Sequence, residues 1–333
     1  MAVLYLTEQG AIVRKTGDRL IVEKDGKKLA EIPCAKLESI LVFGNVQVTT
    51  PALAELLDHG IELAFLTVGG RLRGQLTPPK AKNMPLRMRQ YDAARDEPFR
   101  LALARELVRA KVENAAAMLA RHRGHHQDRV PREAIESLET AALSVEKASS
   151  LDALRGVEGA AAARYFGAFP GLLPEGWTFP GRQRRPPPDP VNALLSFGYV
   201  LVGNELQSLL DAIGFDPYLG FFHEVEYGRP SLALDLLEEF RAPLVDRFAA
   251  TLLQLGTLRR EDFVAGPEGG VVLGREGLKT YFAAWERGLA QPIELGEPGE
   301  RPMTFRDLFR RQAERLARAL TEGEPYRGFR LPC

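Results

Sequence analysis

The sequence predicts an α+β protein, in which a small N-terminal β domain of β-sandwich-like form precedes a mainly α-helical domain. Short β-rich runs separated by turn signals fill residues 1–80, whereas Ala, Leu, Arg and Glu at helical spacing fill residues 98–333. The chain has 333 residues, 45% of them hydrophobic. This is enough apolar material for about two domains. Residues 81–97, between the two regions, are predicted to form a basic linker.

The predicted β domain rests on runs rich in Val, Ile, Leu and aromatic residues. These runs lie at residues 3–6, 11–13, 20–22, 39–43 and 61–66. Gly17-Asp18 and Asp25-Gly26 separate neighbouring runs, and Asp-Gly between such segments is a strong hairpin signal. One short helix is expected from about Thr50 to Leu57, because proline at position 51 suits the first turn of a helix.

The predicted helical domain has two interruptions and a well-marked last helix. Residues 170–190 are rich in Pro and Gly and are predicted to form an ordered loop. Residues 263–272 predict a local β-hairpin. The last helix is expected to begin at Thr304, because Asp307 follows three residues later in a capping-box pattern.

Composition limits the classes of function. The 44 Lys and Arg residues balance 44 Asp and Glu, so any affinity for nucleic acid must come from local patches. The only cysteines are Cys34 and Cys333, which excludes a disulfide framework within one chain and favours a cytoplasmic location. No apolar run approaches membrane-spanning length and the first residues lack a signal-peptide pattern, so neither membrane association nor export is expected.

Three basic patches are candidates for contact with an anionic partner. The first, residues 71–89, contains six Lys or Arg and no acid; the alternative interpretation is a solvated linker. The second consists of Arg182, Arg184 and Arg185 in the Pro-rich loop, where nearby aromatic residues add stacking surfaces. The third is the outer face of the last helix.

A histidine and two acids near it form a candidate metal site. His223 follows an apolar run and precedes a predicted helix at residues 231–241. In that helix Asp235 and Glu238 are three residues apart, which places both carboxylates on one face. They either bind a divalent cation together with His223 or form ion pairs with nearby arginines such as Arg241.

Glu158 is a possible further ligand, because it stands alone among small residues. An acid there is either turned into a cleft or exposed at the start of a helix, where the helix dipole favours it.

Three segments resemble the CRISPR-associated spacer integrase and endonuclease family, the "Cas one" family. They are the Leu-Arg-Gly-Val-Glu-Gly segment within residues 151–166, the Pro-Val-Asn-Ala-Leu-Leu-Ser-Phe-Gly-Tyr helix within 188–205, and residues 218–246 with Gly-Phe-Phe-His and Gly-Arg-Pro-Ser-Leu-Ala-Leu-Asp. Their order and spacing agree with the family, and the likeness in architecture covers nearly the whole chain.

The resemblance implies a metal-dependent DNA integrase and endonuclease of CRISPR adaptation. The family's metal site falls on Glu158, His223 and Glu238, with Asp235 as a neighbouring acid that supports the site or takes part in it. Two carboxylates and an imidazole suit Mg²⁺ or Mn²⁺. The expected reaction is transesterification, in which the 3′-hydroxyl of captured DNA attacks a phosphodiester at the boundary of a CRISPR repeat.

Partners follow from charge and from the resemblance. Arg182, Arg184, Arg185 and Arg241 are the predicted contacts to DNA phosphates. The resemblance implies double-stranded and branched DNA as substrates, a homodimer formed through the β domains, and a small ferredoxin-like partner, the second CRISPR-associated adaptation protein. Two other functions fit the same residues: a structure-selective, metal-dependent DNase of DNA repair, and a non-catalytic DNA-binding scaffold.

Overall fold

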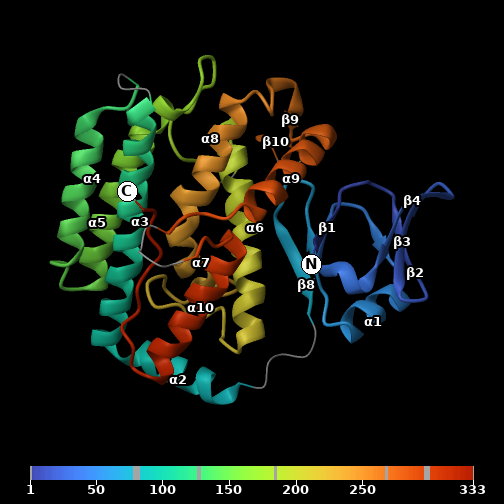
Figure 1. Cartoon of the computed structure of the whole chain (residues 1–333), viewed down its shortest axis with the longest axis horizontal. Helices are drawn as coiled ribbons and strands as arrows, with labels where there is room; N and C mark the ends of the chain where they lie inside the picture. Colours follow the sequence, from blue (N-terminus) through green and yellow to red (C-terminus); the bar gives the residue numbers. More distant parts are fainter. Residues whose placement is uncertain are drawn as a thin grey trace. The chain divides into compact units, whose positions relative to one another are not determined.

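The computed structural model describes residues 2–77, 83–125, 129–183, 186–266, 269–295 and 301–332. The chain divides into two compact units (Figure 1). The smaller unit consists of Met1–Lys80 and Arg260–Ala283, and the larger unit consists of Ala81–Arg259 and Ala284–Cys333. The path of the chain thus enters the larger unit, returns to the smaller one and ends in the larger one.

The strands all belong to the smaller unit. They are β1 (Ala2–Leu6), β2 (Ile12–Thr16), β3 (Arg19–Lys24), β4 (Lys27–Pro33), β5 (Leu37–Phe43), β6 (Gln47–Val48), β7 (Glu62–Leu66), β8 (Leu72–Leu76), β9 (Phe263–Ala265) and β10 (Val271–Leu273). One sheet has the order β1-β5-β7-β8 and another has the order β4-β3-β2-β6. β9 and β10 form the antiparallel hairpin that the sequence predicts.

Local signals explain the smaller unit. Asp25 and Gly26, which join β3 to β4, both have positive φ (49° and 72°), as a two-residue hairpin turn requires. Helix α1 (Thr50–Asp58) has proline in its first turn, as predicted. Apolar residues of both larger sheets and of α1 share one core, which also buries Cys34. These features confirm a sandwich-like β domain.

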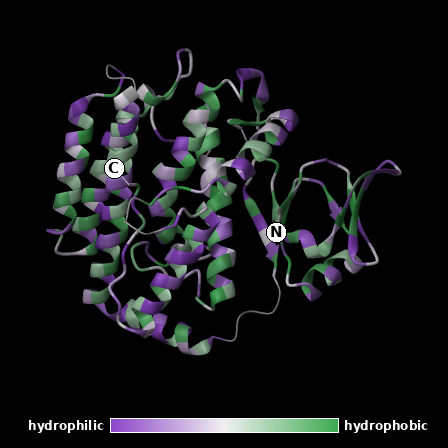
Figure 2. Cartoon of the chain, in the orientation of Figure 1, coloured by the Kyte–Doolittle hydropathy of each residue, from purple (hydrophilic) through white to green (hydrophobic). Residues whose placement is uncertain are grey.

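The larger unit is helical. Its helices are α2 (Met84–Arg95), α3 (Glu97–His125), α4 (Arg132–Val145), α5 (Leu151–Ala168), α6 (Pro190–Ile213), α7 (Ser231–Leu237), α8 (Arg247–Gln254) and α10 (Phe305–Thr321), while α9 (Arg275–Ala290) belongs partly to each unit. α3, α4 and α5 pack against one another, and α10 packs on α2 and α6. Most of these helices carry both apolar and polar residues (Figure 2), which is typical of helices with one face in a core.

The structure differs from the predicted boundaries at two places. Residues 81–97, predicted to be a linker, contain helix α2, whose first turn is capped by the Asn83 side chain accepting a hydrogen bond from Leu86 N. The hairpin of β9 and β10 groups with the smaller unit rather than with the helical one. Side-chain contacts of the following helix with distant residues, such as Phe282 with Tyr5 and Phe43, belong to this grouping, and local composition does not reveal them.

Helix α6 corrects the prediction that no apolar run reaches membrane-spanning length. It is long and apolar enough by length and composition, but 61% of the relevant stretch is buried inside the protein. Asp189 caps its first turn by accepting a hydrogen bond from Asn192 N, and Gly214 ends it with φ of 113°. α6 therefore behaves as a core helix of the larger unit.

A continuous helical path from α7 to α8 positions the site. It passes through a short 3₁₀ turn, Glu238–Phe240, and a π-helical turn, Arg241–Asp246. Pro243 lies within the π turn and has no N–H to continue an α-helical hydrogen-bond ladder. In a π-helix residues five apart share a face, so Arg241 and Asp246 lie on the same side.

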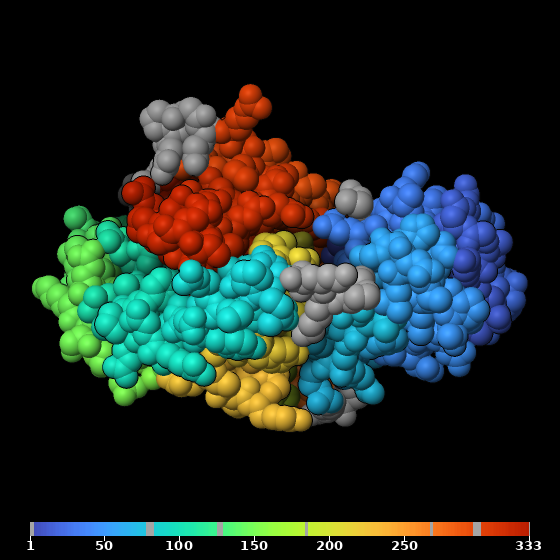
Figure 3. All heavy atoms as spheres, turned by 90° about the horizontal axis from the view of Figure 1, so that it is seen from below, coloured from blue at the N-terminus to red at the C-terminus, as the bar shows by residue number. Residues whose placement is uncertain are grey.

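The C-terminal segment lies over helix α3. Figure 3 shows α10 and the segment that follows it in red beside helices α2 and α3 in cyan. Asn114 on α3 donates a hydrogen bond to the carbonyl of Phe329 (2.9 Å) and accepts one from Leu331 N (2.7 Å). The end of the chain is therefore fixed to the same helix that carries part of the site described next.

Candidate active site

Asp235 anchors the loop that carries His223. This carboxylate is fully buried, and its Oδ2 accepts hydrogen bonds from the backbone N–H groups of Phe221 (2.6 Å) and Phe222 (3.0 Å). Its Oδ1 accepts one from His223 N (2.9 Å) and lies 2.7 Å from His223 Nδ1. Because both oxygens are used in this way, Asp235 supports the loop and orients the imidazole with Nε2 available to the site.

Glu238 faces the free edge of that imidazole. Its Oε1 is 3.7 Å from His223 Nε2, and its Oε2 is 2.7 Å from Lys111 Nζ and 2.9 Å from Arg241 Nε. The side chain is only 3% exposed. Burial alone would raise the pKa of Glu238, but the charges of Arg241 and Lys111 outweigh burial and hold this pKa well below its usual value. Glu238 is therefore a buried, ionised carboxylate.

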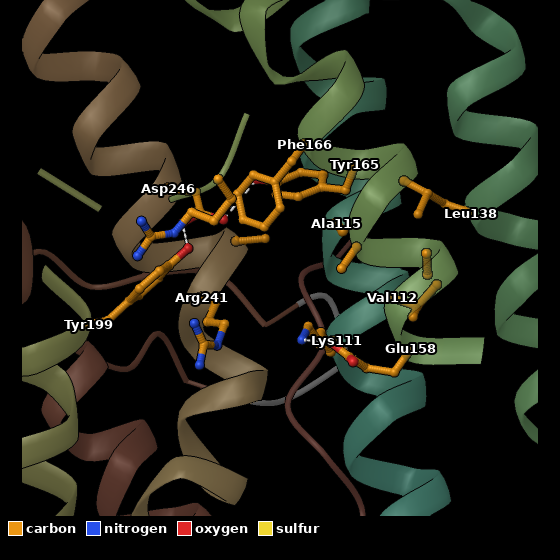
Figure 4. Close-up of a pocket in the computed structure, with 14 residues that line it drawn as sticks. Lys111, Val112, Ala115, Leu138, Glu158, Tyr165, Phe166, Tyr199, Arg241 and Asp246 are labelled. Atoms are coloured by element: carbon orange, nitrogen blue, oxygen red, sulfur yellow. Dashed lines mark hydrogen bonds and ion pairs between the residues drawn. The ribbon is translucent and has the colours of Figure 1, made fainter. Parts of the chain in front are cut away.

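Glu158 is turned into a pocket rather than exposed at a helix start. It lies in the middle of α5, and its Oε1 accepts a hydrogen bond from Lys111 Nζ, which also contacts Glu238. Figure 4 shows Lys111 and Glu158 meeting across the space between α3 and α5. Of the two sequence interpretations of Glu158, the cleft is the one that the structure supports.

The pocket extends from Glu158 to a second set of polar side chains around Asp246. Its lining residues are Lys111, Val112, Ala115, Leu138, Glu158, Ala161, Ala162, Tyr165, Phe166, Arg182, Tyr199, Arg241, Ala242 and Asp246. At the far end, Tyr165 and Tyr199 both donate hydrogen bonds to Asp246, which is buried. The Arg241 guanidinium lies over the Tyr199 ring, 4.4 Å from its centroid. Arg241 thus contacts the Tyr199 ring as well as Glu238, and Figure 4 shows Arg241, Tyr199 and Asp246 in the same part of the pocket.

Burial raises the pKa of Asp246 to about 6, although hydrogen bonds from the two tyrosines and the charge of Arg241 oppose the rise. A folded-state pKa above the usual 3.8 means that the native protein binds the proton more tightly than the unfolded chain. This group's contribution to stability is therefore largest at low pH and is lost as pH rises through 6.

We accordingly expect the stability of the wild type, relative to Asp246→Asn, to fall by about 2 kcal/mol between pH 4.5 and 7. Urea unfolding of both proteins at the two pH values measures the difference. A gap between wild type and variant that does not change with pH would contradict the assignment of a neutral Asp246 at low pH.

The predicted phosphate-binding arginines have separate places. Arg241 is 14% exposed and engaged with Glu238, so it forms a wall of the pocket and not part of an exposed basic patch. Arg182 lines the same pocket and donates hydrogen bonds to Asn192 Oδ1 and Ser196 Oγ, both at 2.9 Å. Arg184 and Arg185 lie outside the described residues.

The other two basic patches are partly tied to the protein itself. In the first, Arg87 belongs to helix α2 and donates to the carbonyl of Phe215 (3.4 Å). In the third, Arg306 on α10 pairs with Glu205 and Glu286. Neither patch is therefore a simple solvated run of charges.

The donor set fits a divalent cation of the Mg²⁺ or Mn²⁺ type. Glu158 and Glu238 supply carboxylate oxygens and His223 supplies an imidazole nitrogen. Glu238 Oε2 is buried and its partners in the described part of the chain are the cationic groups of Lys111 and Arg241. In that same part no three His, Cys, Asp or Glu side chains are arranged to hold an ion. The ammonium group of Lys111 lies between the two carboxylates.

Sequence reasoning missed Lys111, Tyr165, Tyr199 and Asp246. Lys111 follows Val108 by three residues and precedes Ala115 by four, on a face of α3 whose other members are buried. The lysine on this otherwise apolar face could have been recognised in the sequence as a candidate site residue. A helix buries a charged side chain only where that charge has a partner.

The chain is similar in sequence to one family of known proteins. The sequence model of the family described as CRISPR associated protein Cas1 matches residues 4–287. A relative named CRISPR-associated endonuclease Cas1 3, from Thermus thermophilus, is 38% identical over 96% of this chain and 94% of its own.

Solved structures show the same fold. The chain is similar to a casposase bound to integration product, with a TM-score of 0.88, 23% identity, and coverage of 100% of this chain and 94% of that one. It is also similar to a chain of a Cas6-RT-Cas1–Cas2 complex, with a TM-score of 0.84, 26% identity, and coverage of 99% of this chain and 36% of that one.

The fold and the relatives define a class of CRISPR-associated protein. Within that class, the chain belongs to the Cas1 family, as its sequence motifs indicated.

Proposed function

We propose that this chain is a metal-dependent DNA integrase of CRISPR adaptation, which joins 3′-hydroxyl ends of captured DNA to repeat boundaries by transesterification. The observation that carries the proposal is the convergence of Glu158, His223 and Glu238. Glu238 faces His223 Nε2 at 3.7 Å, and Glu158 meets Glu238 through one shared ammonium group. These contacts support the proposal that the three side chains, which come from α5, the loop before α7 and the 3₁₀ turn after it, hold one ion.

Glu158, His223 and Glu238 would hold the Mg²⁺ or Mn²⁺ ion. When bound, such an ion polarises a phosphodiester and stabilises the charge that develops on its oxygens. Asp235 holds the His223 ring in place, so that the imidazole is oriented before DNA arrives. Arg241 stays beside Glu238 and keeps that carboxylate ionised.

The reaction needs no nucleotide cofactor. The 3′-oxygen of the incoming strand forms a new bond to phosphorus, the bond from that phosphorus to the 3′-oxygen of the cut strand breaks, and a new 3′-hydroxyl is released. The number of phosphodiester bonds is unchanged. Arg182, Arg184 and Arg185 are proposed to bind neighbouring phosphates, Arg182 from its position in the pocket wall.

We further propose that the partners are those of the family. The chain resembles the Cas1 part of a complex whose name includes Cas2, so a small Cas2-type protein is the expected partner, with branched and double-stranded DNA as substrate. Homodimerisation is proposed to use the β domain, whose sheets have edge strands such as β1 and β4. The proposed location is the cytoplasm.

A branched DNA with a flap and an adjacent 3′-hydroxyl tests the proposal. The purified protein and His223→Ala are each incubated with it in Mn²⁺ or in EDTA, and joined and released strands are separated on a denaturing gel. We expect joining that requires Mn²⁺ and disappears in the variant, because loss of the imidazole removes one ligand.

The same gel separates the competing functions. Cleavage without joining would favour a structure-selective DNase that uses the same three residues. DNA binding that EDTA does not affect, with no new product, would favour a non-catalytic scaffold and overturn the proposed reaction.

A further inference from the structure

Lys111 occupies a place that neither the sequence motifs nor the proposed reaction explains. Its Nζ donates a hydrogen bond to Glu158 Oε1 and lies 2.7 Å from Glu238 Oε2. One ammonium group thus bridges the two carboxylates that are proposed to share a metal ion. Arg241 adds a second positive charge on Glu238, so two cations balance the two acids.

The two cations differ in how firmly they are held. Arg241 is 14% exposed, lies 4.4 Å from the centroid of the Tyr199 ring, and therefore has contacts besides Glu238. Lys111 is 18% exposed, and the only side-chain contacts that the described residues give its ammonium are Glu158 and Glu238. It also lines the pocket (Figure 4), and its four-carbon stem can rotate.

We propose that Lys111 is an internal counter-ion, which holds Glu158 and Glu238 together in the metal-free protein and is exchanged for the divalent cation on loading. The proposal rests on the proposed metal site and adds the residue that competes with the metal there. The ammonium group of Lys111 must leave when the metal ion binds, for reasons of space and of charge. A cation that binds both carboxylates takes the position of the ammonium group, and a double charge added beside both Lys111 and Arg241 would leave the site with excess positive charge.

The proposal predicts opposite effects for two substitutions of the same residue. Lys111→Met keeps the length and removes the charge, so the metal no longer competes with an ammonium group. Lys111→Arg keeps the charge and adds a planar fork that pairs with carboxylates through two hydrogen bonds. We therefore expect the Kd for Mn²⁺ to fall about tenfold in the methionine variant and to rise in the arginine variant.

Mn²⁺ binding is measured on the purified full chain, by the loss of the free-ion electron paramagnetic resonance signal during titration. Lys147→Met is the matched control, because Lys147 is an exposed lysine beyond the end of α4 and its loss should not change the Kd. An unchanged or raised Kd in Lys111→Met would overturn the proposal, as would tighter binding by Lys111→Arg.

Thermal unfolding without metal gives an independent readout. Removing the counter-ion leaves two carboxylates facing each other, so Lys111→Met should unfold at least about 3 °C below the wild type in EDTA and gain more than the wild type from added Mn²⁺. Combining Lys111→Met with Glu158→Gln should restore part of the loss, because the repulsion then disappears. A metal-free midpoint equal to that of the wild type would contradict the counter-ion role.

His223→Ala separates failure of this inference from failure of the proposed function. If wild type and His223→Ala bind Mn²⁺ equally, the ion does not bind at this site and the proposed function is wrong. If His223 is required but Lys111 substitutions leave the Kd unchanged, only the counter-ion inference is wrong.

Discussion

Replacing Glu238 with Gln is expected to lower metal-dependent cleavage and joining of branched DNA by about 1000-fold or more, which corresponds to the several kcal/mol that a bound metal ion contributes to the transition state. Glu238 is the residue that faces His223 Nε2 at 3.7 Å and contacts both Lys111 and Arg241. An amide in its place binds a divalent cation poorly and removes the negative charge that pairs with Arg241.

A loss of activity in Glu238→Gln must be distinguished from a loss caused by unfolding. Glu226→Gln makes the same chemical change on an exposed residue close to His223 in sequence, and it should retain activity within about twofold. Circular dichroism of both variants shows whether the fold is kept. Activity of Glu238→Gln within tenfold of the wild type, in a folded protein, would show that Glu238 is not a ligand.

Ending the chain after Glu322 is expected to destabilise the larger unit by at least about 5 kcal/mol. Glu239, fully buried beside Glu238, accepts hydrogen bonds from Phe329 N (2.7 Å) and from the Tyr326 hydroxyl. Phe329 is 2% exposed and stacks on Phe240 at 5.5 Å. Truncation removes this ring and leaves a buried carboxylate short of donors.

Burial already raises the pKa of Glu239 to about 7 in the intact protein. Without the C-terminal segment fewer donors offset that burial, so the cost of an ionised Glu239 grows. Urea unfolding followed by far-ultraviolet circular dichroism measures the loss. Arg318→Ala, which removes an exposed ion pair with Glu324, is the control and should cost under about 1 kcal/mol. A truncated protein with the wild-type midpoint would show that the segment is dispensable.

Elements with strong local signals were predicted well from the sequence. The turn at Asp25-Gly26, the helix that begins at Thr50, and the capping box at Thr304 are all confirmed. Each depends on residues within one turn of one another, whose backbone preferences act regardless of distant contacts.

Elements fixed by distant contacts were missed. β4 has the composition of a polar segment because three of its residues, Lys27, Lys28 and Glu31, are charged and exposed at the edge of a sheet. The basic residues of α2 gave it the composition of a linker. The position of β9 and β10 in the smaller unit depends on residues about 200 positions away. Local propensity carries no information about such pairings.

In the candidate site, too, local patterns were predicted from the sequence and contacts between distant residues were not. The motifs pointed to Glu158, His223 and Glu238, and spacing placed Asp235 and Glu238 on one helix face. Spacing could not show that both Asp235 oxygens would be used by the backbone of the preceding loop. Nor could it bring Lys111 from α3 to the carboxylates, because that contact joins residues 47 positions apart.

Glu158, His223 and Glu238 are proposed to hold one divalent cation. The most direct test of this proposal is anomalous diffraction at the manganese edge from crystals of the wild type and of His223→Ala grown with Mn²⁺. We expect a single strong peak in the wild type, in contact with Glu158, His223 Nε2 and Glu238 but not with Asp235, and no peak there in the variant. A peak on Asp235, or none among these side chains, would show that these three residues do not hold the ion.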